Sequence, residues 1–65
     1  MCEDLRNTIH DCYYDVIGVV PTEEQIMGIY NQLPDYVIDL AEQWGGYDTE
    51  VRDSIFVFIK NLKAR

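Results

Sequence analysis

Few residues of this 65-residue chain could perform covalent chemistry. His10 is the only histidine and Ser54 the only serine, and Cys12 lies two residues from His10. Nucleophilic catalysis needs a base beside the nucleophile, but side chains two residues apart on a helix point in different directions. Paired carboxylates need a cleft that separates their pKa values, and a chain this short has little bulk to form one. We therefore expect a protein that is not an enzyme.

The acidic residues do not have the spacing of a known metal site. Asp35, Asp39 and Glu42 recur at intervals of four and three, but no loop such as an EF-hand brings further oxygen ligands to them. The segment 48–53 lacks the glycine and the terminal glutamate of a calcium loop. The cysteines and the histidine lack zinc-finger spacing. We expect no metal and no cofactor.

The two cysteines and the N-terminal residues indicate a cytoplasmic protein. If the first segment is helical, Cys2 and Cys12 lie roughly 15 Å apart along its axis, too far for a disulfide. Free thiols are typical of a reducing cytoplasm. Glu3 and Asp4 stand where a signal peptide would have basic residues. The longest apolar run, 55–59, is too short to span a bilayer, and we expect no membrane association.

Charge is the strongest indication of what the chain binds. Twelve acidic residues and five basic ones give a net charge of −7. No lysine or arginine occurs between Asn7 and Val51, a stretch with nine carboxylates. Such a surface repels nucleic acid and anionic membranes and attracts basic surfaces of other proteins. We expect a protein partner and no direct binding of nucleic acid.

Apolar residues recur at helical intervals in four segments, which predicts an all-α fold. A first helix over 3–17 should end at Gly18. Thr22 and Gln25 have the spacing of a capping box and predict the start of a second helix, which Pro34 should end. The residues expected to face the core are Leu5, Ile9, Cys12, Val16, Ile26, Ile29, Tyr30, Leu33, Val37, Leu40, Ala41, Trp44, Val51, Ile55, Phe58, Ile59 and Leu62.

The third and fourth helices are predicted from the remaining signals. Pro34 suits the first turn of the third helix, and the pair Gly45-Gly46 should end it. Asp48 or Thr49 should cap the fourth. Residues 54–59 also have strand propensity, but a cap precedes them and helix-forming residues follow, so we favour a helix. We therefore predict one domain over 1–65, a bundle of three or four short helices.

The size of the chain and its aromatic residues bear on association. A chain this small buries only about 60% of the surface that its unfolded form exposes, so dimerisation would add stability.

Trp44, Phe58 and Tyr30 are expected in the core. The other tyrosines exceed what so small a core can hold. They could contact a basic partner through cation–π interactions or cover helix ends, and both interpretations stay open. These tyrosines are Tyr13, Tyr14, Tyr36 and Tyr47.

Residues 37–59 resemble the helix-turn-helix pattern of DNA-binding proteins. The matching positions are Leu40, Ala41, Trp44, Gly45 and Val51. Gly46 and Ser54 stand at positions that are usually apolar. A recognition helix in this segment would present three carboxylates and only Arg52, which opposes phosphate binding. We favour two core helices joined by a tight turn and keep a helix-turn-helix transcriptional regulator as an alternative.

Small acidic helical proteins without catalytic residues resemble phage-encoded anti-defence and host-takeover factors, including anti-restriction and anti-CRISPR proteins. This resemblance, which rests on size and charge, implies an inhibitor that occupies a basic, nucleic-acid-binding site of a target protein, with carboxylates in place of phosphates. A structural dimerisation or adaptor module is a further alternative. The expected partner-binding residues are Asp35, Asp39 and Glu42, extended by Asp11, Asp15, Glu23, Glu24, Tyr36 and Tyr47.

Overall fold

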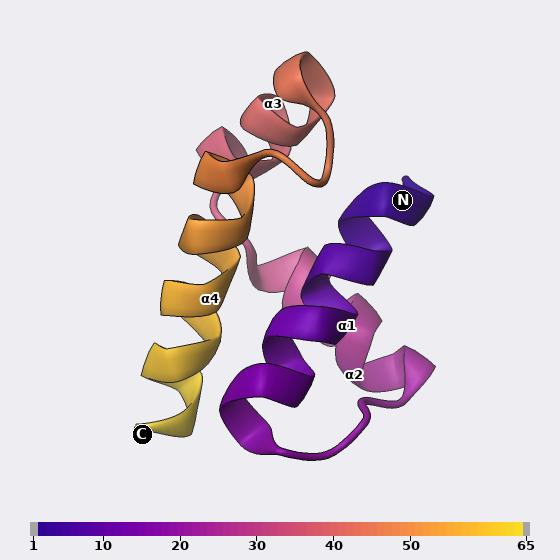
Figure 1. Ribbon diagram of the computed structural model, residues 1–65, viewed down its shortest axis with the longest axis vertical. Coiled ribbons are helices and arrows are strands. Elements are labelled where there is room, and N and C mark those ends of the chain that lie inside the picture. Colours follow the sequence, from indigo (N-terminus) through magenta and orange to yellow (C-terminus); the bar gives the residue numbers. More distant parts are fainter. Residues whose placement is uncertain (1, 65) are drawn as a thin grey trace.

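The computed structural model describes residues 2–64 and contains, within them, four α-helices and no strand (Figure 1). The all-α prediction is confirmed, and residues 54–59 are helical. Arg65, one of the C-terminal cations, lies outside the described residues. The helices are α1 (Glu3–Ile17), α2 (Glu23–Gln32), α3 (Asp35–Trp44) and α4 (Thr49–Lys63).

The helices begin and end where short-range signals predict. Gly18 follows α1 with a φ of 93°, a left-handed conformation that glycine adopts without strain. At the start of α2, the Thr22 hydroxyl accepts a 3.1 Å hydrogen bond from the Gln25 amide, and the Gln25 side chain accepts one of 2.9 Å from the Thr22 amide. Asp48 caps α4 by accepting a 3.0 Å bond from the Glu50 amide. Pro34 lies one residue earlier than predicted, at the N-cap of α3.

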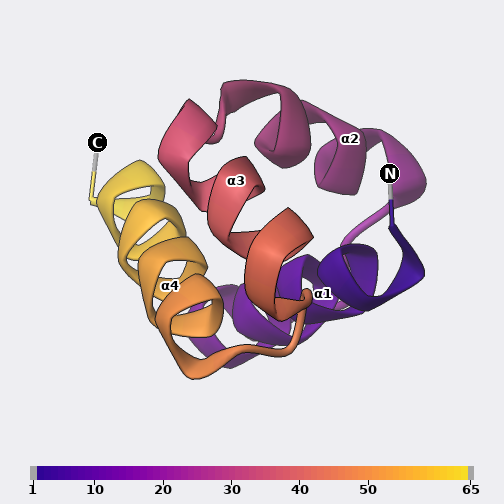
Figure 2. The ribbon, with the colours of Figure 1, turned by 90° about the horizontal axis from the view of Figure 1, so that it is seen from above.

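Helices α1 and α4 lie side by side and run in the same direction (Figures 1 and 2). Helix α2 packs against α1, and α3 packs against α4. Figure 1 places α3 at one end of the long axis, and the end of α4 and the loop after α1 at the other. The long axis measures 28 Å.

The core lies between these helices and contains most of the predicted residues. The buried apolar side chains are Leu5, Ile9, Cys12, Ile26, Ile29, Leu33, Val37, Val51, Ile55 and Ile59. Tyr30 and Phe58, also predicted in the core, are partly buried and pack against this cluster. The helical periodicity therefore identifies the inward face of each helix correctly.

The prediction that Trp44 belongs to the core is wrong, because its side chain is 64% exposed. Trp44 is the last residue of α3 and lies beside Asp48, Thr49 and Glu50 at the start of α4. The apolar stripe of α3 continues to its last residue, where the start of α4 lies on one side of the indole and most of the ring stays open to solvent.

The turn between α3 and α4 presses directly on α1. A Cβ atom added at Gly46 would lie 2.3 Å from the backbone nitrogen of Leu5, so only glycine fits there. The buried Thr8 hydroxyl donates a 2.5 Å hydrogen bond to the Gly46 carbonyl. The pair Gly45-Gly46 is predicted from sequence to end the third helix; in the structure Gly45 is the C-cap, and Gly46 allows this close approach of two backbones.

None of the helices within residues 2–64 combines the length and the apolar character needed to cross a membrane.

Candidate protein-binding face

Helix α3 separates its charged side chains from its apolar ones. Asp35, Asp39 and Glu42 lie on one side because intervals of four and three return to the same face of a helix, and all three are exposed. Val37 is buried on the opposite side, and Leu40 is partly buried. We call Asp35, Asp39 and Glu42 the α3 acidic face.

Among residues 2–64, no cation lies within ion-pairing distance of the three carboxylates of the α3 acidic face. The basic partners of the ion pairs in that part of the chain are Arg6, His10 and Arg52, and they contact acidic residues of α1 and α2, none of them on α3. The negative charge of α3 is therefore exposed to solvent.

An aromatic ring and a shallow depression adjoin the α3 acidic face. Tyr36 is 59% exposed and lies three residues before Asp39, on the neighbouring part of the helix surface. The depression lies between the end of α2 and the start of α3. Its lining residues are Tyr30, Asn31, Leu33, Asp35, Ile38 and Asp39. An elongated cationic side chain could lay its apolar stem on this lining and place its charge against the carboxylates.

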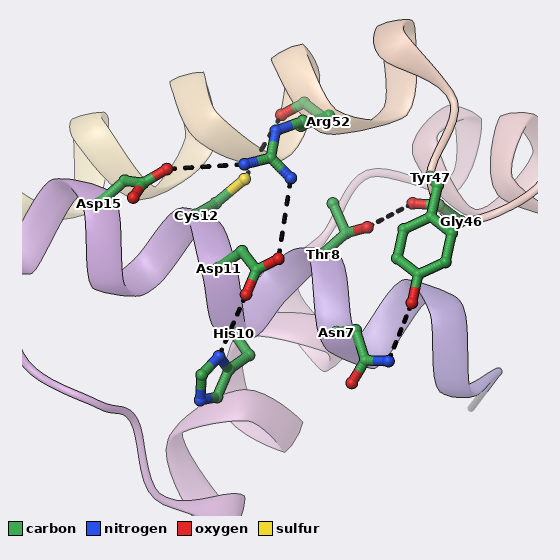
Figure 3. A network of polar contacts seen from close by, with 9 residues as sticks. All are labelled: Asn7, Thr8, His10, Asp11, Cys12, Asp15, Gly46, Tyr47 and Arg52. Atoms are coloured by element: carbon green, nitrogen blue, oxygen red, sulfur yellow. Dashed lines mark hydrogen bonds and ion pairs between the residues drawn. The ribbon is translucent and has the colours of Figure 1, made fainter.

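Two of the predicted partner-binding residues, Asp11 and Asp15, instead surround Arg52 at the seam between α1 and α4 (Figure 3). The Arg52 guanidinium lies 3.6 Å from the Asp15 carboxylate and 4.0 Å from that of Asp11. Asp11 also lies 3.4 Å from Nδ1 of His10. Arg52 therefore compensates much of the charge of this pair.

Glu23 is also compensated within the chain. The guanidinium of Arg6 donates to both oxygens of the Glu23 carboxylate, which joins α1 to the start of α2. Glu24 is exposed beside it. The acidic residues predicted to bind a partner thus form three groups, on α1, α2 and α3, rather than one continuous surface. The groups on α1 and α2 each contain at least one carboxylate paired with an arginine, whereas the α3 acidic face has no ion pair within residues 2–64.

Tyr47 lies over α1, apart from the α3 acidic face. Its ring is 57% exposed, and its hydroxyl accepts a 3.0 Å hydrogen bond from the Asn7 side chain (Figure 3). Of the two tyrosines predicted to bind a partner, Tyr36 is the one beside the α3 carboxylates.

The cysteines differ in their surroundings. Cys2 is exposed and Cys12 is buried, and both are free thiols. The Cys12 thiol donates a long hydrogen bond, 3.7 Å, to the Arg52 carbonyl. Burial raises the pKa of the Cys12 thiol, and the Arg52 guanidinium only partly opposes this. A protonated, enclosed thiol is a poor nucleophile.

Residues 2–64 contain no group of three or more histidine, cysteine or acidic side chains close enough to hold a metal ion. The exposed indole of Trp44 is a further surface feature that the sequence pattern did not indicate. Its position on the apolar stripe of α3 predicts burial, because the helical spacing of apolar residues contains no information about how far a neighbouring helix extends.

No family model matches this chain, and comparisons with curated proteins and with solved structures found no match either.

Proposed function

We propose that the protein is a non-enzymatic binding module whose α3 acidic face docks on a basic surface of another protein. The observation that supports this is the exposure of Asp35, Asp39 and Glu42 without a cationic partner among residues 2–64. Unpaired carboxylates at regular intervals on a rigid helix attract a basic surface over distance and orient it on contact.

The partner we propose is a protein that itself binds nucleic acid, and the module acts as its inhibitor. The α3 carboxylates would take the place of phosphates in the basic groove of that protein. Tyr36 and the depression next to it supply apolar and aromatic contacts for arginine side chains. A phage anti-defence or host-takeover factor would inhibit its target in this way.

The test is affinity capture from a host lysate, comparing the unmodified protein with the variant D35N/D39N/E42Q. We expect the variant to keep its helical circular dichroism spectrum, because these side chains are exposed, and to lose the basic partner. The affinity for that partner, measured after identification by mass spectrometry, should fall at least about tenfold. Excess duplex DNA should compete with capture if the occupied site binds nucleic acid.

The matched control is D11N/D15N/E23Q. It removes the same number of carboxylates, but these contact Arg52 and Arg6 within the chain. We expect it to capture the partner normally. Equal capture by D35N/D39N/E42Q and the unmodified protein would reject the α3 acidic face as the binding site.

The helix-turn-helix regulator has less support. Residues 45–48 join α3 to α4 in a short turn, and Val51 is buried as that motif requires. Arg52, however, is the one cation near the start of α4 in the described chain, and it lies against Asp11 and Asp15 rather than toward a ligand. An adaptor module is favoured by the exposed apolar residues Phe56 and Val57 on α4.

A further inference from the structure

A groove at the opposite end of the molecule from α3 combines an apolar lining with two ammonium groups. It lies between the last turn of α1 and the last turns of α4. Lys60 Nζ lies 5.6 Å from the centroid of the Phe56 ring, and Lys63 Nζ donates a 3.1 Å hydrogen bond to the Val16 carbonyl. We call this the C-terminal groove; its lining residues are Val16, Phe56, Lys60, Lys63 and Ala64.

The two lysines have no acidic partner among residues 2–64. The described part of the chain therefore has an uncompensated basic site on α4 and an uncompensated acidic site on α3. Figure 1 shows these two helix regions at opposite ends of the long axis, which measures 28 Å, so they cannot meet within one chain.

The two sites match in charge and in spacing. Lys60 and Lys63 are three residues apart on α4, and Asp35 and Asp39 are four residues apart on α3. Side chains at either interval start about 5–6 Å apart on a helix. The exposed ring of Tyr36 could lie on the apolar lining of the groove, while Asp35 and Asp39 reach the two ammonium groups.

We propose that copies of this chain associate head to tail, with the C-terminal groove of one copy on the α3 acidic face of the next. Symmetric pairing is unfavourable at either site. Two acidic faces would bring six carboxylates together, and two grooves would bring four lysines together. A head-to-tail contact avoids both repulsions. Because it leaves one site open at each end, assemblies grow with concentration.

Association of this kind regulates access to the α3 acidic face. A second copy covers the same carboxylates that the basic partner of the proposed function would contact, so the two compete. This consequence rests on the proposed function. The head-to-tail contact does not, because it needs only the two sites of this chain.

The test is sedimentation velocity of the full chain at about 0.1 M ionic strength, where repulsion between chains of net charge −7 is largely screened. Protein concentrations reach about 1 mM, because a contact built on exposed ion pairs is weak. We expect the average mass to rise steadily with concentration and to return to that of the monomer at high salt. K60Q/K63Q and D35N/D39N should each weaken association at least about tenfold. Circular dichroism checks that both variants remain helical.

An equimolar mixture of K60Q/K63Q and D35N/D39N tests whether the C-terminal groove of one copy binds the α3 acidic face of another. The first variant keeps its acidic face and the second keeps its groove, so the mixture should form a 1:1 dimer and grow no further. Three results would contradict the proposal: the unmodified protein is monomeric at every concentration, the K60Q/K63Q variant still self-associates, or the mixture of the two variants stays monomeric. K60Q/K63Q retains the α3 acidic face and should still capture the basic partner, which separates failure of this inference from failure of the proposed function.

Discussion

Arg6 and Arg52 compensate three of the acidic residues that the sequence predicts to bind a partner. Arg6 holds Glu23, and Arg52 lies against Asp11 and Asp15. These are ion pairs between partly exposed side chains, and such pairs contribute about 0–1 kcal/mol of stability. Of the acidic residues predicted to bind a partner, they leave Glu24 and the three carboxylates of the α3 acidic face without an ion pair in residues 2–64.

Single residues also determine how stability depends on pH. In the unfolded chain the Cys12 thiol ionises at about pH 8.5, whereas in the folded protein burial raises its pKa. Above about pH 8.5 the unfolded state therefore binds fewer protons than the folded state. The contribution of Cys12 to stability falls as the pH rises from this value through the raised pKa of the folded protein. Below pH 8.5 the contribution is fully present.

We therefore expect the free energy of unfolding to decrease more steeply between pH 8 and pH 10 in the unmodified protein than in Cys12→Ala. Urea titrations at each pH measure the difference. Cys12→Ala has a smaller core side chain and is less stable at pH 7, so the comparison concerns the slope with pH. Parallel slopes would show that the thiol does not ionise differently in the two states.

At the scale of elements, the turn between α3 and α4 determines where α3 lies. Gly46 contacts the backbone of α1 at Leu5, and Thr8 donates a hydrogen bond to the Gly46 carbonyl. This contact fixes the end of α3 relative to α1 and so positions the α3 acidic face. Two glycines in the chain can be compared to test it, because Gly28, inside α2, has open space around its Cβ position.

Gly46→Ala should destabilise the protein by about 3 kcal/mol, at the upper end for overpacking, because backbone rather than a movable side chain blocks the new methyl group. Gly28→Ala is the control and should stabilise it by about 0.5–1 kcal/mol through its better helix propensity. Thermal and urea unfolding measure both values. A neutral effect of Gly46→Ala would mean that the turn does not press on α1.

At the scale of the whole molecule, charge opposes folding. The net charge of −7 is confined to a body whose longest dimension is 28 Å. At 0.01 M salt the Debye length is about 30 Å, so every carboxylate acts on every other. At 0.1 M it is about 10 Å, and mainly neighbours interact. Repulsion across the molecule is then largely screened, while close pairs such as Arg6 and Glu23 persist.

Added salt should therefore stabilise this protein. Between about 0.01 M and 0.1 M sodium chloride we expect the midpoint of thermal unfolding to rise by about 4–8 °C, which corresponds to about 1 kcal/mol for a domain of this size. The variant D35N/D39N/E42Q carries three fewer negative charges and should respond less. Dilute protein avoids self-association in this measurement. A midpoint that falls with salt would show that the ion pairs outweigh the general repulsion.

The features that the sequence alone determined are local ones. The capping box of Thr22 and Gln25, the stop at Gly18 and the cap at Asp48 depend on hydrogen bonds within four residues, so they are readable from spacing. The inward face of each helix follows from periodicity in the same way. The predicted α3 acidic face is correct as a set of neighbours on one helix for this reason.

Tertiary structure alone decided the features that join distant residues. Arg52 meets Asp11, Gly46 meets Thr8 across 38 positions, and Trp44 lies exposed at the end of α3. No interval along the chain encodes these contacts, because they depend on how helices of different lengths lie against one another. Among the acidic residues predicted to bind a partner, packing therefore paired Asp11, Asp15 and Glu23 with arginines and left the α3 acidic face without an ion pair in residues 2–64. It also placed that face and the C-terminal groove at opposite ends of the molecule.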